Sequence, residues 1–298
     1  MGKNISLVLG SGGARGYAHI GVIEVLEDYG FEIQSIAGSS MGALIGGLYA
    51  CGKLNAYKEW VLTLEVLDVL KLLDFTIGKI GFIKGDRIFN IIEEMIGEHN
   101  IEDLPISFSA VATDLTTQKE VWLQKGSLST AVRASIAIPT IFTPVEIQNK
   151  ILVDGGILDP VPIGPTLSDM TDLTVVVNLN STKTIKEQII ITEKEKKRQR
   201  LLHDKINTFL EQKLPGKEKP GLRYTTIFRK TINAMQHTIA RYKMAGYQPD
   251  IVIEIPMDCC DFYDFHKAYE MIELGKKIAK DTLEGLGNLK HSRNSEGG

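Results

Sequence analysis

The sequence predicts an α/β fold around a mostly parallel β-sheet. Two strand–turn–helix units fill about the first fifty residues: the apolar runs Ile5–Leu9 and Ile33–Ala37 each lead into a glycine-containing turn, and apolar residues at helical spacing follow. Strands that alternate with helices are typical of a parallel sheet covered by helices. Further runs of strand length extend the sheet, namely Phe108–Ala112, Glu120–Leu123, Ile151–Val153, Leu173–Val177 and Ile251–Ile255.

Helical periodicity predicts the remaining long elements. Helices follow the first two turns, over Ala18–Tyr29 and Met41–Cys51, and a glycine lies just past the end of each. Two long helices are expected later, at Tyr224–Tyr247 and Phe265–Leu283. No repeat or linker divides the chain, so we expect one domain over residues 1–287, with a charged insertion at 183–223. The polar residues 288–298 are predicted to form a disordered tail.

The leucine- and valine-rich stretch Ala56–Phe75 has helical spacing and two interpretations. We favour a helix packed in the core. The alternative is a mobile wall or lid over an apolar pocket, with Gly78, Gly81 and Gly85 as flexible joints.

The composition narrows the class of protein. Hydrophobic residues make up 43% of the 298 residues, which is ample for a large core, and the formal net charge of −3 gives no sign of nucleic-acid binding. The three cysteines, Cys51, Cys259 and Cys260, form no disulfide framework or zinc motif. With no secretory signal and no run of about 20 apolar residues, we expect a cytoplasmic protein.

The segment Gly38–Gly42 fits the pattern G-x-S-x-G with Ser40 at its centre. This pattern marks a sharp turn from a strand to a helix, which holds the serine in a strained backbone conformation with its hydroxyl exposed. Gly38 and Gly42 are needed because side chains there would collide with the neighbouring strand and helix. The alternative is an ordinary glycine-rich turn with a capping serine.

The loop Gly10–Gly16 joins the first strand to the first helix, so its amides form an anion site at a helix N-terminus. One candidate anion is a nucleotide pyrophosphate, with Glu32 as the ribose-binding acid, although the glycine spacing departs from G-x-G-x-x-G. The other is the oxyanion of a tetrahedral acyl intermediate. We favour the oxyanion, because it explains why a glycine loop and a nucleophile turn follow the first two strands of one sheet.

Asp154 ends a predicted strand at the turn Asp154-Gly155-Gly156. Asp-Gly is common in plain turns, but a carboxylate at this sheet edge could also take the proton of Ser40. A triad would need a histidine on a loop after a strand. None of the six fits that position, so we prefer a Ser–Asp dyad; they are His19, His99, His203, His237, His266 and His291.

In this order, the three motifs resemble the patatin-like phospholipase family, especially its compact bacterial members. The resemblance covers about Ile5 to Pro162 and extends to the last predicted helix. The block Arg133–Pro139 is similar to a family segment that lines the site. The resemblance implies a three-layer α/β/α sandwich and an enzyme without metal or cofactor.

The resemblance assigns a role to each motif residue. Ser40 corresponds to the nucleophile and Asp154 to the acid. The residues implied around them are the oxyanion donors Gly12, Gly13 and Ala14 and the supporting residues Arg15, Gly38, Gly42, Gly155 and Gly156. Ser11 departs from the plant enzymes, which have a third glycine there, but it removes no amide.

We therefore expect a serine acyl hydrolase that cleaves fatty acyl esters of lipids, as a phospholipase A, lysophospholipase or esterase. The alternative is a nucleotide- or phosphate-binding module that uses Gly10–Gly16. The segment Lys183–Arg223 contains twelve Lys/Arg and six Asp/Glu, a net charge of +6. It is either a solvated surface or a basic patch for peripheral contact with anionic membranes. The sequence does not indicate an oligomeric state.

Overall fold

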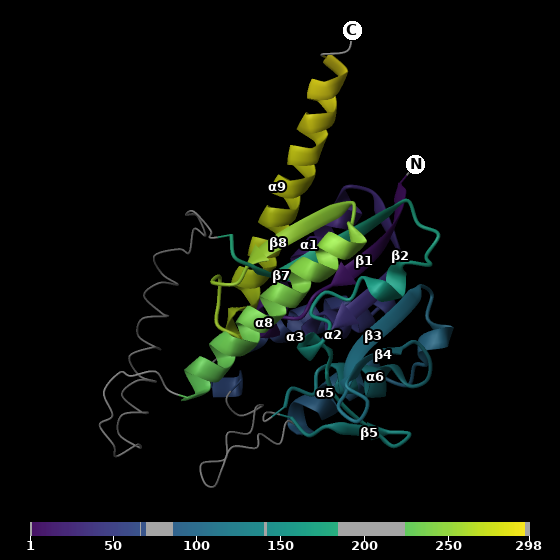
Figure 1. The fold of residues 1–298 in the computed structure, drawn as a ribbon, viewed down its shortest axis with the longest axis vertical. Coiled ribbons are helices and arrows are strands. Elements are labelled where there is room, and N and C mark those ends of the chain that lie inside the picture. The colour runs from purple at the N-terminus through teal and green to yellow at the C-terminus, as the bar shows by residue number, and fades with distance from the viewer. Residues whose placement is uncertain (1, 66, 70–85, 140–141, 184–223, 296–298) are drawn as a thin grey trace, which may run out of the picture.

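An eight-stranded mixed sheet forms the centre of the molecule (Figure 1). The computed structural model describes residues 2–65, 67–69, 86–139, 142–183 and 224–295. Five neighbouring strands are parallel and extend to one edge of the sheet, in the order β3 (Ser107–Asp114), β2 (Phe31–Ser39), β1 (Lys3–Leu9), β7 (Leu173–Ser181) and β8 (Ile251–Pro256). Three antiparallel strands lie on the β3 side, namely β4 (Lys119–Leu123), β5 (Val145–Ile147) and β6 (Lys150–Asp154).

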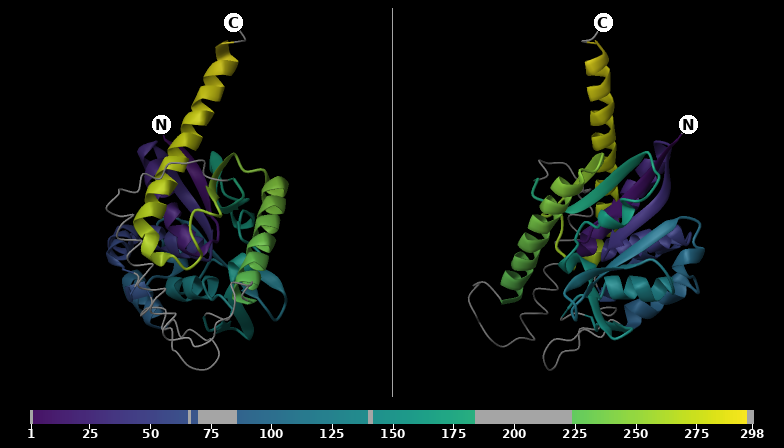
Figure 2. Two further views of the ribbon diagram at one scale, coloured as in Figure 1. Left: turned by 90° about the vertical axis from the view of Figure 1, so that its left-hand side faces the viewer. Right: turned by 45° about the vertical axis from the view of Figure 1, so that its right-hand side comes forward.

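Helices cover both faces of this sheet, as the predicted three-layer sandwich requires. Successive side chains of a strand point to opposite faces. Leu7 and Leu9 accordingly join the main core, which also includes residues of α1 (Ala18–Asp28), α2 (Met41–Ala50) and α9 (Ala268–Ser295). Val8 instead packs with Ala240 of α8 (Tyr224–Tyr247). Figure 2 shows α8 and α9 on opposite sides of the sheet. The α/β/α prediction is confirmed.

The register of β3 brings two distant strands end to end. Ala110 and Val111 pair with both β2 and β4, and residues 112–114 pair with both β4 and β6. Strands β2 and β6 must therefore share the edge of β3 opposite β4. Since Ser39 is opposite Val111 and Asp154 is opposite Ala112, the carboxyl ends of β2 and β6 meet there.

The other helices agree with the sequence to different degrees. Helix α8 has the predicted bounds, Tyr224–Tyr247. The single helix predicted for Ala56–Phe75 is wrong in extent, because α3 (Leu54–Thr63) ends where Leu64 turns extended, with ψ 124°. Residues 67–69 are helical again, and residues 70–75 lie outside the described part. Two helices had not been predicted, α5 (Asp86–Ile96) and α6 (Leu128–Ser135).

The C-terminal helix is longer than predicted. Helix α9 runs from Ala268 to Ser295 and so enters the segment that we expected to be a disordered tail. No proline interrupts these residues, so the backbone ladder can continue. Residues 184–223 of the charged insertion and the glycines of the predicted lid joints lie outside the described residues. The single-domain assignment stays a prediction. None of the described helices combines the length and the apolar character that crossing a bilayer requires.

Candidate active site

The turn from β2 into α2 holds Ser40 in an uncommon backbone conformation. Its φ of 55° and ψ of −124° lie outside the regions that side chains normally permit. The neighbouring glycines allow this turn, because a Cβ on Gly42 would lie 1.9 Å from the carbonyl oxygen of Leu9. The Ser40 amide donates to Ser135 Oγ at 3.0 Å, and Ser135 donates to the Val111 carbonyl at 2.6 Å. The backbone of Ser40 is thus tied to α6 and β3.

The hydroxyl of Ser40 donates a hydrogen bond to Asp154 Oδ2 at 2.5 Å. The other carboxylate oxygen accepts from the amide of Gly156 at 2.8 Å. Both side chains are buried, with exposed fractions of 3% and 5%. Burial raises the pKa of Asp154 to about 6, although the two hydrogen bonds favour the ionised form. Near neutral pH this carboxylate is therefore ionised and able to take a proton from the serine.

His19 and His237 bond to backbone carbonyls and not to the Ser40–Asp154 pair. His19 is fully buried and bonds to the Gly10 carbonyl at 2.8 Å; since a carbonyl only accepts, its Nε2 donates. Burial lowers the pKa of His19 to about 4, so it stays neutral and supports the glycine loop. His237 lies on α8 and bonds to the carbonyl of Asn180. Among the described side chains, no histidine bonds to Ser40 or Asp154; the side chains of His203 and His291 are not among them.

The glycine loop presents two amides side by side. With φ 174° and ψ 17° at Gly12, the N–H groups of Gly12 and Gly13 converge on one point. Neither amide has an acceptor among the residues described here. Gly13 and Ser40 line the same cavity. Ala14 differs, because its N–H already donates to the Phe262 carbonyl at 2.9 Å. The Ala14 amide is therefore not free, contrary to the prediction, and Gly12 and Gly13 stay the predicted donors.

The buried side chain of Arg15 binds the backbone of this loop. Its side chain is 1% exposed; Nε donates to the Gly12 carbonyl at 3.1 Å, and Nη1 donates to the Met257 carbonyl at 2.9 Å. A peptide unit is planar and trans, so its C=O and N–H point in opposite directions. By holding the Gly12 carbonyl, Arg15 turns the Gly13 N–H the opposite way. Gly13 itself has φ +58°, and a Cβ there would meet Phe262 at 2.6 Å.

The position of Glu32 removes one support for nucleotide binding. Glu32 pairs with Asn4 at the start of β1, whereas the glycine loop follows the end of β1. The ribose-binding acid of a dinucleotide fold belongs near the carboxyl ends of the strands, beside the phosphate loop. In this chain that place, after β2, is occupied by Ser40.

An apolar cavity opens beside Ser40. Its lining is almost entirely aliphatic and aromatic, contributed by α2, α3, α5 and the segment after α6; it includes Leu44, Trp60, Ile92, Ile136, Ile138 and Phe142. The Ala56–Phe75 stretch takes part through Tyr57, Trp60, Leu64 and Val69. Tyr57 and Val61 are buried as a packed helix requires. The described part of the stretch is therefore both core and pocket wall. Whether it moves stays a prediction.

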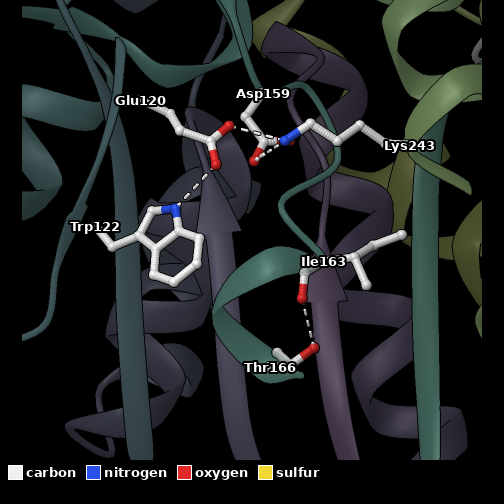
Figure 3. A network of polar contacts seen from close by, with 6 residues as sticks. All are labelled: Glu120, Trp122, Asp159, Ile163, Thr166 and Lys243. Atoms are coloured by element: carbon white, nitrogen blue, oxygen red, sulfur yellow. Dashed lines mark hydrogen bonds and ion pairs between the residues drawn. The ribbon is translucent and has the colours of Figure 1, made fainter. Parts of the chain in front are cut away.

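A second buried carboxylate, which the sequence did not reveal, lies five residues after the first. Asp159 is fully buried, and Lys243 of α8 donates to it at 3.1 Å and to Glu120 of β4 at 2.8 Å. Figure 3 shows this network, in which Trp122 also donates to Glu120. Burial raises the pKa of Asp159 to about 7, with Lys243 acting in the opposite direction. No motif marks this contact, because its two sides are 84 residues apart.

Together these features define an α/β protein with a buried serine–aspartate pair, two convergent amides and an apolar cavity at one sheet edge. Residues 7–167 match the patatin-like phospholipase family. The chain belongs to this family. It is 36% identical to an uncharacterized NTE family protein of Mycobacterium tuberculosis, over 95% of this chain and 92% of the relative.

More distant relatives agree with this assignment. Lysophospholipase NTE1 of Cryptococcus neoformans is 31% identical over 60% of this chain but only 11% of its own length. Among solved structures, VipD from Legionella pneumophila superimposes with a TM-score of 0.53 at 16% identity, covering 95% of this chain and 67% of the other. The structural likeness supports the fold alone.

Proposed function

We propose that this protein hydrolyses fatty acyl esters of lipids with Ser40 as nucleophile and Asp154 as general base. The observation that carries the proposal is the 2.5 Å hydrogen bond from Ser40 Oγ to a buried carboxylate, next to two unpaired amides. A serine is a weak nucleophile unless a base takes its proton. Asp154 is in hydrogen-bond reach without any rearrangement.

The proposed reaction has two halves. Ser40 Oγ attacks the acyl carbonyl carbon while its proton passes to Asp154, and the oxyanion accepts hydrogen bonds from the Gly12 and Gly13 amides. The intermediate collapses, the bond to the alcohol oxygen breaks, and Asp154 returns the proton to that oxygen. Water then attacks the acyl-enzyme in the same way, so that a fatty acid leaves and Ser40 is restored.

The cavity supports an apolar acyl group as the part of the substrate that is bound. Ser40 lies in its wall, and Gly13 lies in the same wall, so a chain in the cavity would reach the hydroxyl and one amide with its carbonyl end. Burial of a hydrocarbon contributes about 0.8 kcal/mol per CH₂ group. We therefore propose phospholipase A, lysophospholipase or esterase activity, and the name of the Cryptococcus relative favours lysophospholipids among these.

Labelling with a fluorophosphonate probe tests the nucleophile. We expect the probe on Ser40, and the Ser40→Ala variant should lose both the label and the hydrolysis of acyl esters. Ser39→Ala is the matched control, since Ser39 is equally buried and adjacent in the sequence. Labelling of Ser39, or hydrolysis by Ser40→Ala at the wild-type rate, would overturn the proposal.

We further propose peripheral contact with anionic membrane surfaces, in the region of the basic segment and α8. Helix α8 follows that segment and has four Lys/Arg residues and no Asp or Glu. Ile227, Met235 and Tyr242 are exposed along it, with Tyr242 76% exposed. Basic helices with an apolar stripe are typical of interfacial binding.

Sedimentation with vesicles tests this contact. Binding should increase with the fraction of anionic lipid and fall in Met235→Glu. Met170→Glu is the control, because Met170 is fully exposed and lies outside α8, on the loop before β7. Equal binding to neutral and anionic vesicles would exclude the electrostatic part of the proposal.

A further inference from the structure

Asn180, near the end of β7, contacts the glycine loop. Its side chain is fully buried, and Nδ2 donates to the Ser11 carbonyl at 3.1 Å. Ser11 is also fixed through its own amide, which donates to the Pro160 carbonyl at 2.9 Å. Asn180 belongs to none of the three motifs, and 169 residues separate it from Ser11.

The bond to Ser11 determines where the next amide points. The Ser11 carbonyl and the Gly12 N–H belong to one planar trans peptide, so they point in opposite directions. A donor that holds the carbonyl therefore directs the Gly12 N–H away from Asn180. Arg15 does the same to the following peptide through the Gly12 carbonyl. Two buried donors thus fix two successive peptides, and the two amides they orient are the pair that converges.

Helix α8 secures this arrangement. His237 bonds to the Asn180 carbonyl at 2.7 Å, so its Nδ1 is the donor. The preceding residue, Gln236, is 7% exposed and donates to the Gly156 carbonyl at 3.0 Å. Gly156 in turn donates to Asp154. Adjacent residues of one helix therefore hold the glycine loop and the acid turn in a fixed relation.

We infer that Asn180 is a positioning residue of the oxyanion site, which directs the Gly12 amide and is itself held by His237. This inference rests on the proposed hydrolase function. It acts on the transition state, because the Gly12 amide matters most when the carbonyl oxygen becomes charged. Loss of one oxyanion donor typically costs about 10²–10³-fold in kcat. A misdirected donor should cost less, about 10- to 100-fold.

The test compares Asn180→Ala and Asn180→Leu with wild type on one acyl ester. We expect kcat to fall about 10- to 100-fold with little change in KM. The inhibition constant of an alkyl trifluoromethyl ketone, which forms a tetrahedral oxyanion on the serine, should rise by a similar factor. A fatty alcohol of equal chain length occupies the cavity without an oxyanion, so its inhibition constant should stay unchanged.

Two further variants separate positioning from general stability. Thr166→Val removes another buried side-chain bond, from Thr166 Oγ1 to the Ile163 carbonyl, and should lower stability without changing the ketone-to-alcohol ratio. His237→Asn keeps a donor near the position of Nδ1 and should restore most of the activity that His237→Leu loses. An unchanged ketone constant in both Asn180 variants would overturn the inference. Full activity in Ser40→Ala would instead overturn the function on which it rests.

Discussion

Asp154 and Asp159 lie at the two ends of one short turn, and both are buried, with exposed fractions of 5% or less. Their partners differ. Asp154 accepts from a hydroxyl and an amide, both neutral, and no Lys or Arg in the described parts of the chain pairs with it. Asp159 pairs with the lysine of α8, which it shares with Glu120. Residue type and burial are equal, so the partner alone distinguishes the two.

The difference shows how burial can serve either chemistry or structure. Burial raises the pKa of both carboxyl groups, to about 6 for Asp154 and to about 7 for Asp159, but only Asp154 can take a proton without disrupting an ion pair. That property suits a general base. A buried carboxylate with a cation is part of a fixed contact, since separating the pair would leave a charge uncompensated. One turn thus has a reactive end, at Asp154, and an anchored end, at Asp159.

The largest expected effect comes from removing each carboxylate in turn. Asp154→Asn should lower kcat by at least about 10³-fold, because Ser40 loses its base, while the protein remains folded. Asp159→Asn should keep most of the activity, because Asp159 does not touch the serine. Steady-state kinetics with one acyl ester, together with circular dichroism, measures both. Comparable losses in the two variants would remove the functional distinction between the two ends.

The anchored end should appear in stability. Lys243→Met leaves Asp159 and Glu120 without their cation, and we expect the free energy of unfolding to fall by about 2–3 kcal/mol, somewhat below the range for a fully buried pair because Lys243 is partly exposed. Urea titration measures this change. In Lys276→Met, the surface ion pairs with Glu24 and Glu273 are lost, and the change should be about 1 kcal/mol or less.

The double variant sharpens the same test. Asp159→Asn in the Lys243→Met background removes the buried charge that the first substitution leaves unpaired, so part of the lost stability should return. Strictly additive losses would mean that Lys243 and Asp159 do not stabilise each other.

The two ends also differ in how far the sequence predicted them. Ser40, Asp154 and the glycines around them were predicted because strained turns and close backbone approach leave few residue choices, and these choices form short local patterns. Asp159, Lys243 and Asn180 were missed because their contacts join residues far apart in the chain through ordinary side chains. Such pairs become visible only when β-strand register and helix docking are known.

The same contrast holds for the fold. Alternating strands and helices predicted the sheet and most of its strands, since period and turn chemistry are local. The end of α3 at Thr63 was missed, because the apolar pattern continues past the point where the chain turns toward the cavity. The prediction that the Ala14 amide is a free donor failed for the same reason, since the Phe262 carbonyl that accepts its hydrogen bond comes from a distant segment.

The pH dependence should report the reactive end alone. Asp154 must be ionised to act as a base, and its pKa is raised to about 6, so kcat/KM should rise about tenfold per pH unit below 6 and level off above it. Asp159→Asn should leave this profile in place, although burial raises the pKa of Asp159 to about 7. If the midpoint of the profile moves in Asp159→Asn, then Asp159, and not Asp154, determines the pH dependence, and Asp154 is wrongly assigned as the base.

The contribution of Asp154 to stability should depend on pH in the sense opposite to kcat/KM, and should fall as the pH rises. A carboxyl group whose pKa is raised by folding stabilises the native state below its unfolded pKa of about 4, and this contribution is lost as the pH rises through about 6. Asp154→Asn should therefore be more stable than wild type at pH 8, and this advantage should shrink toward pH 4. Thermal melts at the two pH values measure the difference; an advantage that grows toward low pH would contradict it.

The smallest expected effect concerns the neutral contact between α8 and the reactive end. Gln236→Leu removes the donor to the Gly156 carbonyl, and we expect kcat to fall several-fold, in line with about 1 kcal/mol for one hydrogen bond. Gln34→Leu is the matched control, since Gln34 donates only to Asn4 at the surface. If Gln236→Leu lowers stability but not kcat, then α8 anchors the turn solely through Lys243, and the position of Asp154 depends on its own strand.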